Sequence, residues 1–242
     1  MKTILAILIF ALASTATAQK KLPQKPYTEW SLQEVMMLLQ NSPWVEASVQ
    51  FAQGRRGDVP DRPPGTEFYV EVRLYSALPI RQAIVRRMQL TIPYAKLTGA
   101  QRASFDAEVD GLLKCAQCAE YYIVTIASAS QYPFSFATRG DPHTLDTVEV
   151  VKRVPQDELL RHVSLSNDNG ELRNAARAVF TQRNEVVFLF SRVDEHGKPL
   201  ITPANKKFSL EFDDYLSKKT EGSLKKFTFN VKDILRDTEV LF

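Results

Sequence analysis

The two cysteines of the chain, Cys115 and Cys118, are the residues whose type and spacing point most directly to chemistry. In an exported protein, two cysteines three residues apart form a redox pair, a structural disulfide or half of a metal site. Thioredoxin-like proteins place the first cysteine at a helix N-terminus, where the helix dipole stabilises the thiolate. Here a helix pattern ends at the cysteines and a strand pattern follows, with Lys114 as the one neighbouring cation in the sequence. We therefore expect a local structural disulfide, with a redox-active pair as the alternative.

Signatures of cofactor binding and hydrolysis are missing from the sequence. Haem attachment requires a histidine directly after the second cysteine, and Ala119 stands at that position. A zinc site requires two more ligands at matching spacing, whereas His143, His162 and His196 are isolated from one another. Neither G-x-S-x-G nor H-E-x-x-H occurs. We predict no cofactor and no metal, and we keep a hydrolase without a sequence signature as a further alternative.

Two segments carry residues that could contact a protein partner. Arg56, Gly57 and Asp58 spell the adhesion tripeptide within residues 54–65, a loop rich in glycine, proline and charge. Three arginines lie off the apolar stripe of a helix that we expect to begin near Pro79, and they are candidate contacts for an acidic partner. These arginines are Arg81, Arg86 and Arg87. Solvation of a loop and of a helix face explains the same residues more simply.

The N-terminus has the three parts of a secretory signal peptide. Lys2 supplies the positive charge, residues 4–13 form a short apolar run, and Ala16-Thr17-Ala18 is a small-residue cleavage site. The apolar run is too short to cross a bilayer, which requires about 18–20 residues. We predict that residues 1–18 are removed after Ala18 and that residues 19–27 are a linker. The mature protein is then secreted or periplasmic, with no transmembrane anchor.

The amino-acid composition and net charge bear on whether the protein binds nucleic acid. Charged residues make up 24% of the chain and hydrophobic residues 44%, proportions typical of a folded globular protein. The formal net charge of +3 is mild, and basic residues are not clustered as nucleic-acid binding requires. We therefore predict no nucleic-acid partner.

Hydrophobic periodicity divides the expected N-terminal α/β domain, residues 28–139, into helices and strands. Ser31 with Glu34 and Thr98 with Gln101 have the spacing of capping boxes, which mark helix N-termini. Apolar and polar residues alternate in three segments, which we predict to be strands. These segments are Trp44–Phe51, Glu67–Tyr75 and Tyr121–Ala127.

Residues 140–242 are predicted to form a C-terminal antiparallel β-sandwich domain, with a soft boundary near Gly140. Short strand patterns separated by turn residues dominate this part, a spacing typical of sandwiches. The expected strands are Leu145–Val154, His162–Ser166, Val186–Arg192, Lys207–Phe212 and Lys225–Val231. The predicted fold class is α+β.

Several motifs together resemble a family of uncharacterised secreted bacterial proteins. The first block is W-S-x-x-E-V, beginning at Trp30, followed by L-L-x-x-S-P-W, which ends at Trp44. The second block is S-A-L-P-I-R-Q-A, beginning at Ser76. The resemblance spans most of the mature chain and implies secretion and the two-part layout. It carries no catalytic residue to this sequence.

Because enzymatic signatures are missing, the sequence favours a non-catalytic binding or assembly module that acts outside the cytoplasm on another protein. The first alternative is a thiol–disulfide protein that uses Cys115 and Cys118. The second alternative is the hydrolase without a sequence signature. Fold class does not decide among them, since similar folds host many functions.

Overall fold

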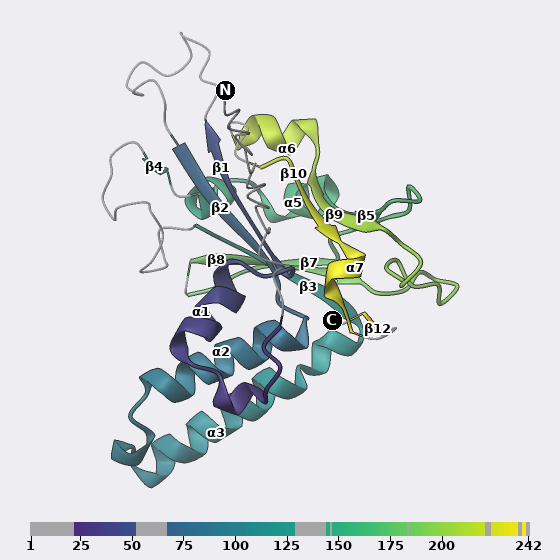
Figure 1. Ribbon diagram of the computed structural model, residues 1–242. Coiled ribbons are helices and arrows are strands. Elements are labelled where there is room, and N and C mark those ends of the chain that lie inside the picture. Colours follow the sequence, from purple (N-terminus) through teal and green to yellow (C-terminus); the bar gives the residue numbers. More distant parts are fainter. Residues whose placement is uncertain are drawn as a thin grey trace, which may run out of the picture.

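The computed structural model describes residues 22–51, 67–128, 144–145, 147–182, 184–220, 224–236 and 239–240. The predicted signal peptide, the Arg56-Gly57-Asp58 segment and the expected boundary near Gly140 lie outside these residues. The described chain combines helices with antiparallel sheets, so its class is α+β as predicted (Figure 1).

The first elements are the 3-10 turn η1 (Tyr27–Glu29) and helix α1 (Leu32–Gln40). The predicted capping box is present, because the Ser31 side chain accepts from the Glu34 amide while Glu34 reaches back to the Ser31 amide. Trp30 precedes this cap and is buried with the apolar face of α1 in the core. The chain therefore enters α1 at a fixed angle.

A six-stranded sheet contains strands from both halves of the chain. Strand β1 (Val45–Phe51) pairs with β2 (Glu67–Leu74), β2 with β3 (Tyr121–Ser128), β3 with β8 (Glu185–Ser191), and β8 with β7 (Arg177–Phe180), all antiparallel. The short β4 (Thr144–Leu145) pairs with β2 in parallel. The strands predicted for Trp44–Phe51 and Glu67–Tyr75 are thus confirmed as the antiparallel pair β1–β2.

A four-stranded sheet has the order β10-β9-β5-β6. Its strands are β5 (Val163–Asn167), β6 (Leu172–Asn174), β9 (Lys207–Phe212) and β10 (Lys226–Asn230). Apolar side chains alternate with polar ones along β10, where Phe227 and Phe229 are buried. The Phe188 ring of β8 lies 6.3 Å from the Phe212 ring of β9, measured between centroids, so the two sheets meet in one core.

The strands after residue 140 differ from the expected separate sandwich. Strands β7 and β8 join the N-terminal strands β1 to β3, while β5, β6, β9 and β10 form the other sheet. Hydrogen bonding therefore crosses the expected division into residues 28–139 and 140–242. The physical reason is the apolar character of β3 and β8, whose Ile123 and Leu189 are buried on the face opposite the core residues Val124 and Phe188. Such strands belong in the interior of a sheet.

The predicted strand over Leu145–Val154 is wrong in its central part, because Thr147–Val151 forms helix α4. Val148 and Val151, three residues apart, are both fully buried in the core. Burial at helical spacing overrides the strand propensity of β-branched residues.

Further short elements complete the described chain. They are α5 (Gln156–His162), α6 (Asp214–Lys219), α7 (Val231–Ile234), β11 (Leu235–Arg236) and β12 (Glu239–Val240).

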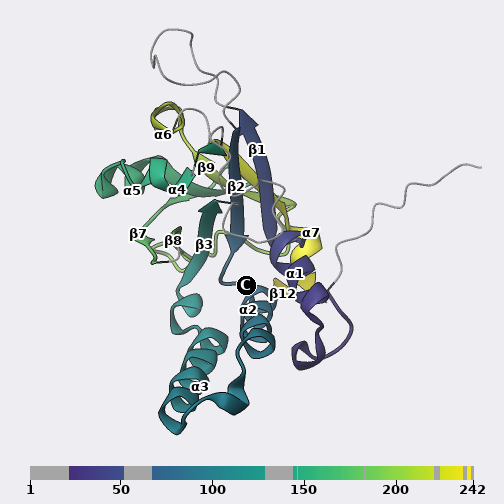
Figure 2. The same ribbon diagram turned by 90° about the vertical axis from the view of Figure 1, so that its left-hand side faces the viewer.

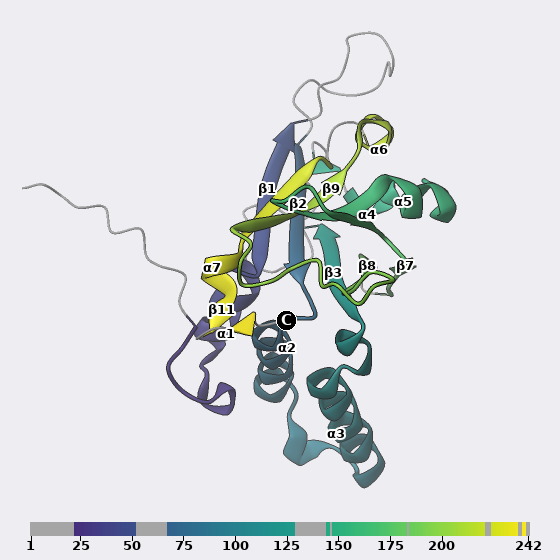
Figure 3. The same cartoon turned by 90° about the vertical axis from the view of Figure 1, so that its right-hand side faces the viewer.

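Two helices project from one end of the sheets, as Figures 1 and 2 show. Helix α2 (Leu78–Thr91) has Pro79 in its first turn, and the turn η2 (Tyr94–Lys96) connects it to α3 (Gly99–Lys114). The second predicted capping box is present, with Thr98 as N-cap and Gln101 as its partner. We call residues 78–114 the helical arm. Helices α5 and α6 lie at the opposite end of the molecule (Figure 3).

Candidate functional site

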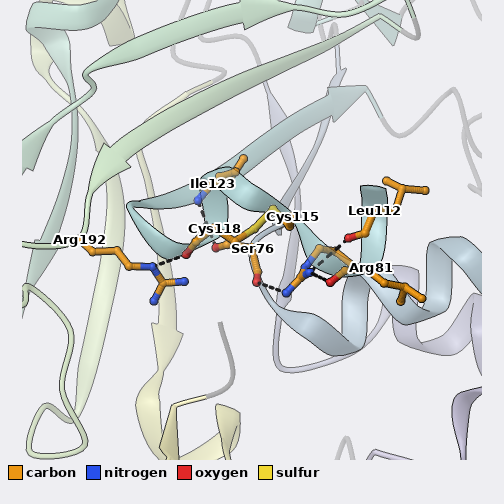
Figure 4. Close-up of a disulfide and its surroundings, with 8 residues drawn as sticks. Ser76, Arg81, Leu112, Cys115, Cys118, Ile123 and Arg192 are labelled. Atoms are coloured by element: carbon orange, nitrogen blue, oxygen red, sulfur yellow. Dashed lines mark hydrogen bonds between the residues drawn. A yellow bond between two sulfur atoms is a disulfide. The ribbon is translucent and has the colours of Figure 1, made fainter. Parts of the chain in front are cut away.

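The helical arm joins the six-stranded sheet at a disulfide between Cys115 and Cys118. Their Cα atoms are 5.3 Å apart, within the usual range for a disulfide. Cys115 is the C-cap of α3, and Cys118 lies in the 3-10 turn η3 (Ala116–Ala119) that leads into β3 (Figure 4). Cys118 is buried, whereas Cys115 is partly exposed. The predicted disulfide is therefore present, at the predicted junction of helix and strand.

Arg81 was expected on a solvated face of α2, and the structure corrects this expectation, because only 5% of the residue is exposed. Its Nη1 donates to the carbonyl of Leu112 at 3.2 Å and to the carbonyl of Leu113, and its Nη2 donates to the carbonyl of Ser76 at 3.4 Å. The last carbonyls of a helix lack partners within that helix and carry partial negative charge. Arg81 therefore caps the C-terminus of α3 and fixes it to the start of α2.

Arg192 approaches the disulfide from the other side, as Figure 4 shows. Its Nε donates to the Cys118 carbonyl at 2.6 Å, and its guanidinium carbon lies 4.8 Å from the centre of the Tyr122 ring. The β3–β8 register places it there, because Tyr121 pairs with Ser191 and the Arg192 amide then donates to the Glu120 carbonyl at 2.9 Å. The sequence offered no sign of this contact, since 74 residues separate Arg192 from Cys118.

Both arginines beside the disulfide are partly removed from water. Burial lowers the pKa of Arg81; the Tyr75 phenol opposes this shift, and the like charge of Arg192 adds to it. Burial also lowers the pKa of Arg192, against the opposing effect of Tyr122. Two cations thus share a weakly solvated environment around the cysteine pair.

Ser76 fastens this region to the sheet. Its amide donates to the Ile123 carbonyl at 3.2 Å, and its hydroxyl accepts from the Ile123 amide at 3.1 Å. Ser76 also supplies one of the carbonyls that Arg81 binds. The disulfide turn, the start of α2 and strand β3 therefore form one hydrogen-bonded unit.

The other two arginines of α2 point to different parts of the protein. Arg86 donates from Nε to the Trp30 carbonyl at 2.9 Å and so binds α2 to the segment before α1. Arg87 is partly exposed, and its charge acts on Glu71 of β2. The sequence grouped these three arginines as contacts for an acidic partner. In the structure they do not share one surface, because Arg81 is buried and Arg86 binds the Trp30 carbonyl.

The tip of the arm is closed by contacts around Tyr94. Its ring packs edge-on against Phe105, with the centroids 5.5 Å apart, and its hydroxyl donates to Asp106 at 2.9 Å. The Arg102 guanidinium lies over the same ring and donates to the Ala95 carbonyl at 2.9 Å. The arm is therefore fixed at its tip as well as at its base.

Helix α3 has an unusual exposure pattern for its length. None of its 16 residues is buried. The partly buried positions are Phe105, Val109, Leu112 and Leu113, which recur at helical spacing and mark the packed side. The opposite side presents small exposed residues, Ala100, Ala103, Ala107 and Gly111. Most of the surface of α3 is thus left open.

A buried ion pair that the sequence did not indicate lies on β2. Glu71 and Arg73, each 5% exposed, form a salt bridge two residues apart on one face of the strand, and Arg73 also donates to the Leu39 carbonyl at 2.9 Å. Burial raises the pKa of Glu71 to about 6, although the charge of Arg73 opposes the rise. Glu71 therefore changes its charge near pH 6, above the range of an ordinary glutamate.

A second polar cluster joins α5 to the start of α6. His162 Nδ1 lies 2.6 Å from Asp213 Oδ2, and the imidazole packs against the Tyr215 ring at 4.4 Å between centroids. The pairing of Val163 with Phe212 brings these residues together at the strand ends. Within the described residues no hydroxyl or thiol hydrogen-bonds to His162.

Comparison of the chain with known protein families, with curated proteins and with solved structures finds no match. In the described part of the chain, no helix is both long and apolar enough to cross a membrane. The same residues contain no group of three or more metal-ligating side chains. Inference about function therefore rests on the arm and on the disulfide at its base.

Proposed function

We propose that the protein is an exported, non-catalytic binding module that contacts another extracytoplasmic protein through the helical arm. The observation that carries this proposal is the exposure of α3, in which none of the 16 residues is buried. Helices in folded proteins are stabilised mainly by burying one face against the rest of the chain. Helix α3 leaves most of its surface exposed to solvent, and a partner protein can cover this exposed surface.

The fixed ends of the arm support this role. Tyr94 and Arg102 close the tip, while Arg81 and the disulfide hold the base. A rigid element loses less conformational entropy on binding than a flexible one. The arm is therefore preorganised for binding.

The exposed side of α3 also favours close contact. Ala103 and Ala107 are small and lie one turn apart on the open side. Small side chains let the surface of a partner approach the helix backbone, and alanine loses no side-chain entropy on burial. We therefore place the centre of the contact at these two residues.

Site-specific photo-crosslinking in cells tests the proposal. A photoreactive amino acid is placed at Ala103 or Ala107, and at the exposed control positions Asn169 and Lys218 on other elements. We expect both arm positions to yield the same crosslinked protein and both control positions to yield none. Equal crosslinking at arm and control positions, or none from the arm, contradicts a binding role for α3.

A matched pair of variants makes the test quantitative. In this test the photoreactive amino acid is placed at the neighbouring position Ala100. The double variant Ala103→Glu with Ala107→Glu introduces two charges on the open side of α3 and should reduce the yield of crosslinked product at least tenfold, compared with the same probe in the otherwise unchanged protein. Asn169→Glu with Lys218→Glu, away from the arm, should leave it unchanged. Circular dichroism checks that both double variants keep their helix content.

A further inference from the structure

The turn at the far end of the helical arm presents apolar side chains to solvent. We call residues 90–98 the arm tip, which runs from the end of α2 through η2 to the N-cap of α3. None of these residues is buried, and Leu90 and Tyr94 are 40% and 39% exposed. The larger apolar and aromatic residues of the tip are Leu90, Ile92, Pro93, Tyr94 and Leu97. Single exposed apolar residues are common on protein surfaces, whereas a group of them at one place indicates an interaction site.

The arm places this group of side chains at an extremity of the molecule. Helix α3 has 16 residues and is therefore about 24 Å long. Figures 1 and 2 show the turn between α2 and α3 at the end of the arm that lies farthest from both sheets. Contacts of Tyr94 hold the turn in position, because its hydroxyl donates to Asp106 at 2.9 Å and its ring packs against Phe105. A flat surface can therefore reach the arm tip without contacting the sheets.

The chain around the arm tip is positively charged. Residues 72–105 include no aspartate and no glutamate. Lys96 in the tip and Arg102 in α3 are exposed, and Arg87 in α2 is partly exposed. The Arg102 guanidinium carbon lies 5.6 Å from the centre of the Tyr94 ring, so a cation and the exposed aromatic ring occupy the same part of the surface. The electrostatic complement of this surface is negatively charged.

We propose that the arm tip docks on a lipid bilayer with anionic headgroups. Leu90, Pro93 and the exposed edge of the Tyr94 ring enter the boundary between headgroups and acyl chains, while Lys96 and Arg102 face the lipid phosphates. Peripheral membrane sites combine apolar and aromatic side chains with cations in this way. Tyrosine suits the boundary because its ring is apolar and its hydroxyl is polar. This contact is separate from the open side of α3 and goes beyond the proposed contact with a protein.

An acidic protein is the other class of partner that basic and apolar residues suit. A specific protein interface involves about 20–30 residues on each partner, whereas the arm tip comprises only residues 90–98. A bilayer requires no such area, because fluid lipids adapt to a projecting turn and each Lys or Arg near anionic headgroups adds attraction. The small size and the position of the tip therefore favour a lipid surface.

Sedimentation with lipid vesicles tests the proposal. The probes are vesicles of equal parts phosphatidylglycerol and phosphatidylcholine, and neutral vesicles of phosphatidylcholine alone. The exported protein is used, and mass spectrometry establishes its N-terminus, because an uncleaved signal peptide would itself bind lipid. We expect the partition coefficient for the anionic vesicles to exceed that for the neutral vesicles about tenfold. Equal partition into both, or capture of an acidic protein by the tip without any binding to vesicles, overturns the proposal.

A matched pair of double variants locates the contact on the protein. Leu90→Ser with Lys96→Glu changes the arm tip, whereas Leu172→Ser with Lys225→Glu makes the same changes at exposed positions on β6 and before β10. The two double variants therefore have the same composition and net charge. We expect the tip variant to bind the anionic vesicles about tenfold more weakly, and the control variant to bind them like the unchanged protein. Circular dichroism checks the helix content of both, and equal binding by the two variants overturns the proposal.

Fluorescence quenching shows whether the tip itself enters the bilayer. Leu90→Trp places an indole at the arm tip, and Leu172→Trp places one on β6, while Trp30 and Trp44 are buried in the core. The vesicles contain phosphatidylglycerol and phosphatidylcholine with brominated acyl chains, which quench an indole only at close range. We expect the fluorescence of Leu90→Trp to be quenched and that of Leu172→Trp to stay unchanged. Binding without selective quenching of Leu90→Trp shows adsorption through another face and overturns the proposal.

Discussion

Arg81, in the first turns of α2, donates a hydrogen bond to the carbonyl oxygen of Leu112 in the last turns of α3, 3.2 Å away. The same guanidinium binds the carbonyls of Leu113 and Ser76, so one side chain joins both helices of the arm to the segment that enters the sheet. Because the residue is buried, these bonds form away from competing water. The position of the arm therefore depends strongly on Arg81.

We predict that Arg81→Met lowers the free energy of unfolding by about 3 kcal/mol, the upper end for hydrogen bonds from a charged group. The last carbonyls of α3 lose their donors, so amide exchange in the last turn of α3 should accelerate selectively. Arg86→Met, which removes a single bond to the Trp30 carbonyl, is the control and should cost about half as much. Urea unfolding and hydrogen exchange measure both effects. Equal losses with unchanged exchange in α3 would count against this role of Arg81.

The two capping boxes should respond differently to the same change. Thr98→Ala and Ser31→Ala each remove an N-cap oxygen, at a cost of about 1 kcal/mol. Helix α1 has three buried residues that hold it to the core, whereas α3 has none. We expect Thr98→Ala to raise local amide exchange in the first turn of α3, and Ser31→Ala to act only through global stability. Similar local exchange in both helices would contradict this difference.

Local features of the fold could be predicted from the sequence because they depend on residues close together in the chain. Both capping boxes, the alternation of β1 and β2 and the bounds of β9 at Lys207–Phe212 are of this kind. Helix α4 could not be predicted, because its β-branched residues favour a strand and only burial of Val148 and Val151 selects a helix.

The surroundings of the candidate site depend on contacts between distant residues. Arg81 is 31 residues from Leu112, and Arg192 is 74 residues from Cys118. The apolar stripe expected on the helix near Pro79 is buried in α2, at Ile80, Ala83 and Ile84, but the stripe could not show that Arg81 would also be covered. That requires the path of α3, which follows from the disulfide turn and the register of β3 with β8. The cysteines were therefore predictable, and the cations beside them were not.

Glu71 should make stability depend on pH between about 4.5 and 6. Burial raises the pKa of Glu71 in the folded protein to about 6 from an ordinary value of 4.5, so the folded state holds this proton more tightly. The associated stability is complete below pH 4.5 and is lost as pH rises through 6. Relative to Glu71→Gln, the unchanged protein should lose about 2 kcal/mol across this interval. Urea unfolding at several pH values measures the difference, and parallel curves for the two proteins would refute the prediction.

Asp213 should give the opposite dependence of stability on pH, with a smaller change in the free energy of unfolding. Burial favours the neutral carboxyl, but hydrogen bonds from the Leu216 amide and from His162 outweigh it and lower the pKa of Asp213. Its contribution is therefore present above about pH 4 and is lost as pH falls further. Asp213→Asn keeps a capping oxygen but removes the charge, so we expect a loss below about 1 kcal/mol at pH 6, because the pair is partly exposed. Asp214→Asn is the control, and a loss that persists unchanged at pH 3 would contradict the assignment.

Replacement of both cysteines by serine separates the proposed binding role from the alternative of a thiol–disulfide protein. The loop closed by the disulfide is short, so its loss should lower the free energy of unfolding by about 2 kcal/mol on the chain-entropy model. Arg81 and Ser76 still hold the base of the arm through their hydrogen bonds. We therefore expect the double serine variant to fold and to retain crosslinking through Ala103 and Ala107. Loss of crosslinking in a variant that keeps its helix content would show that the function requires the cysteine pair, and it would favour the thiol–disulfide alternative.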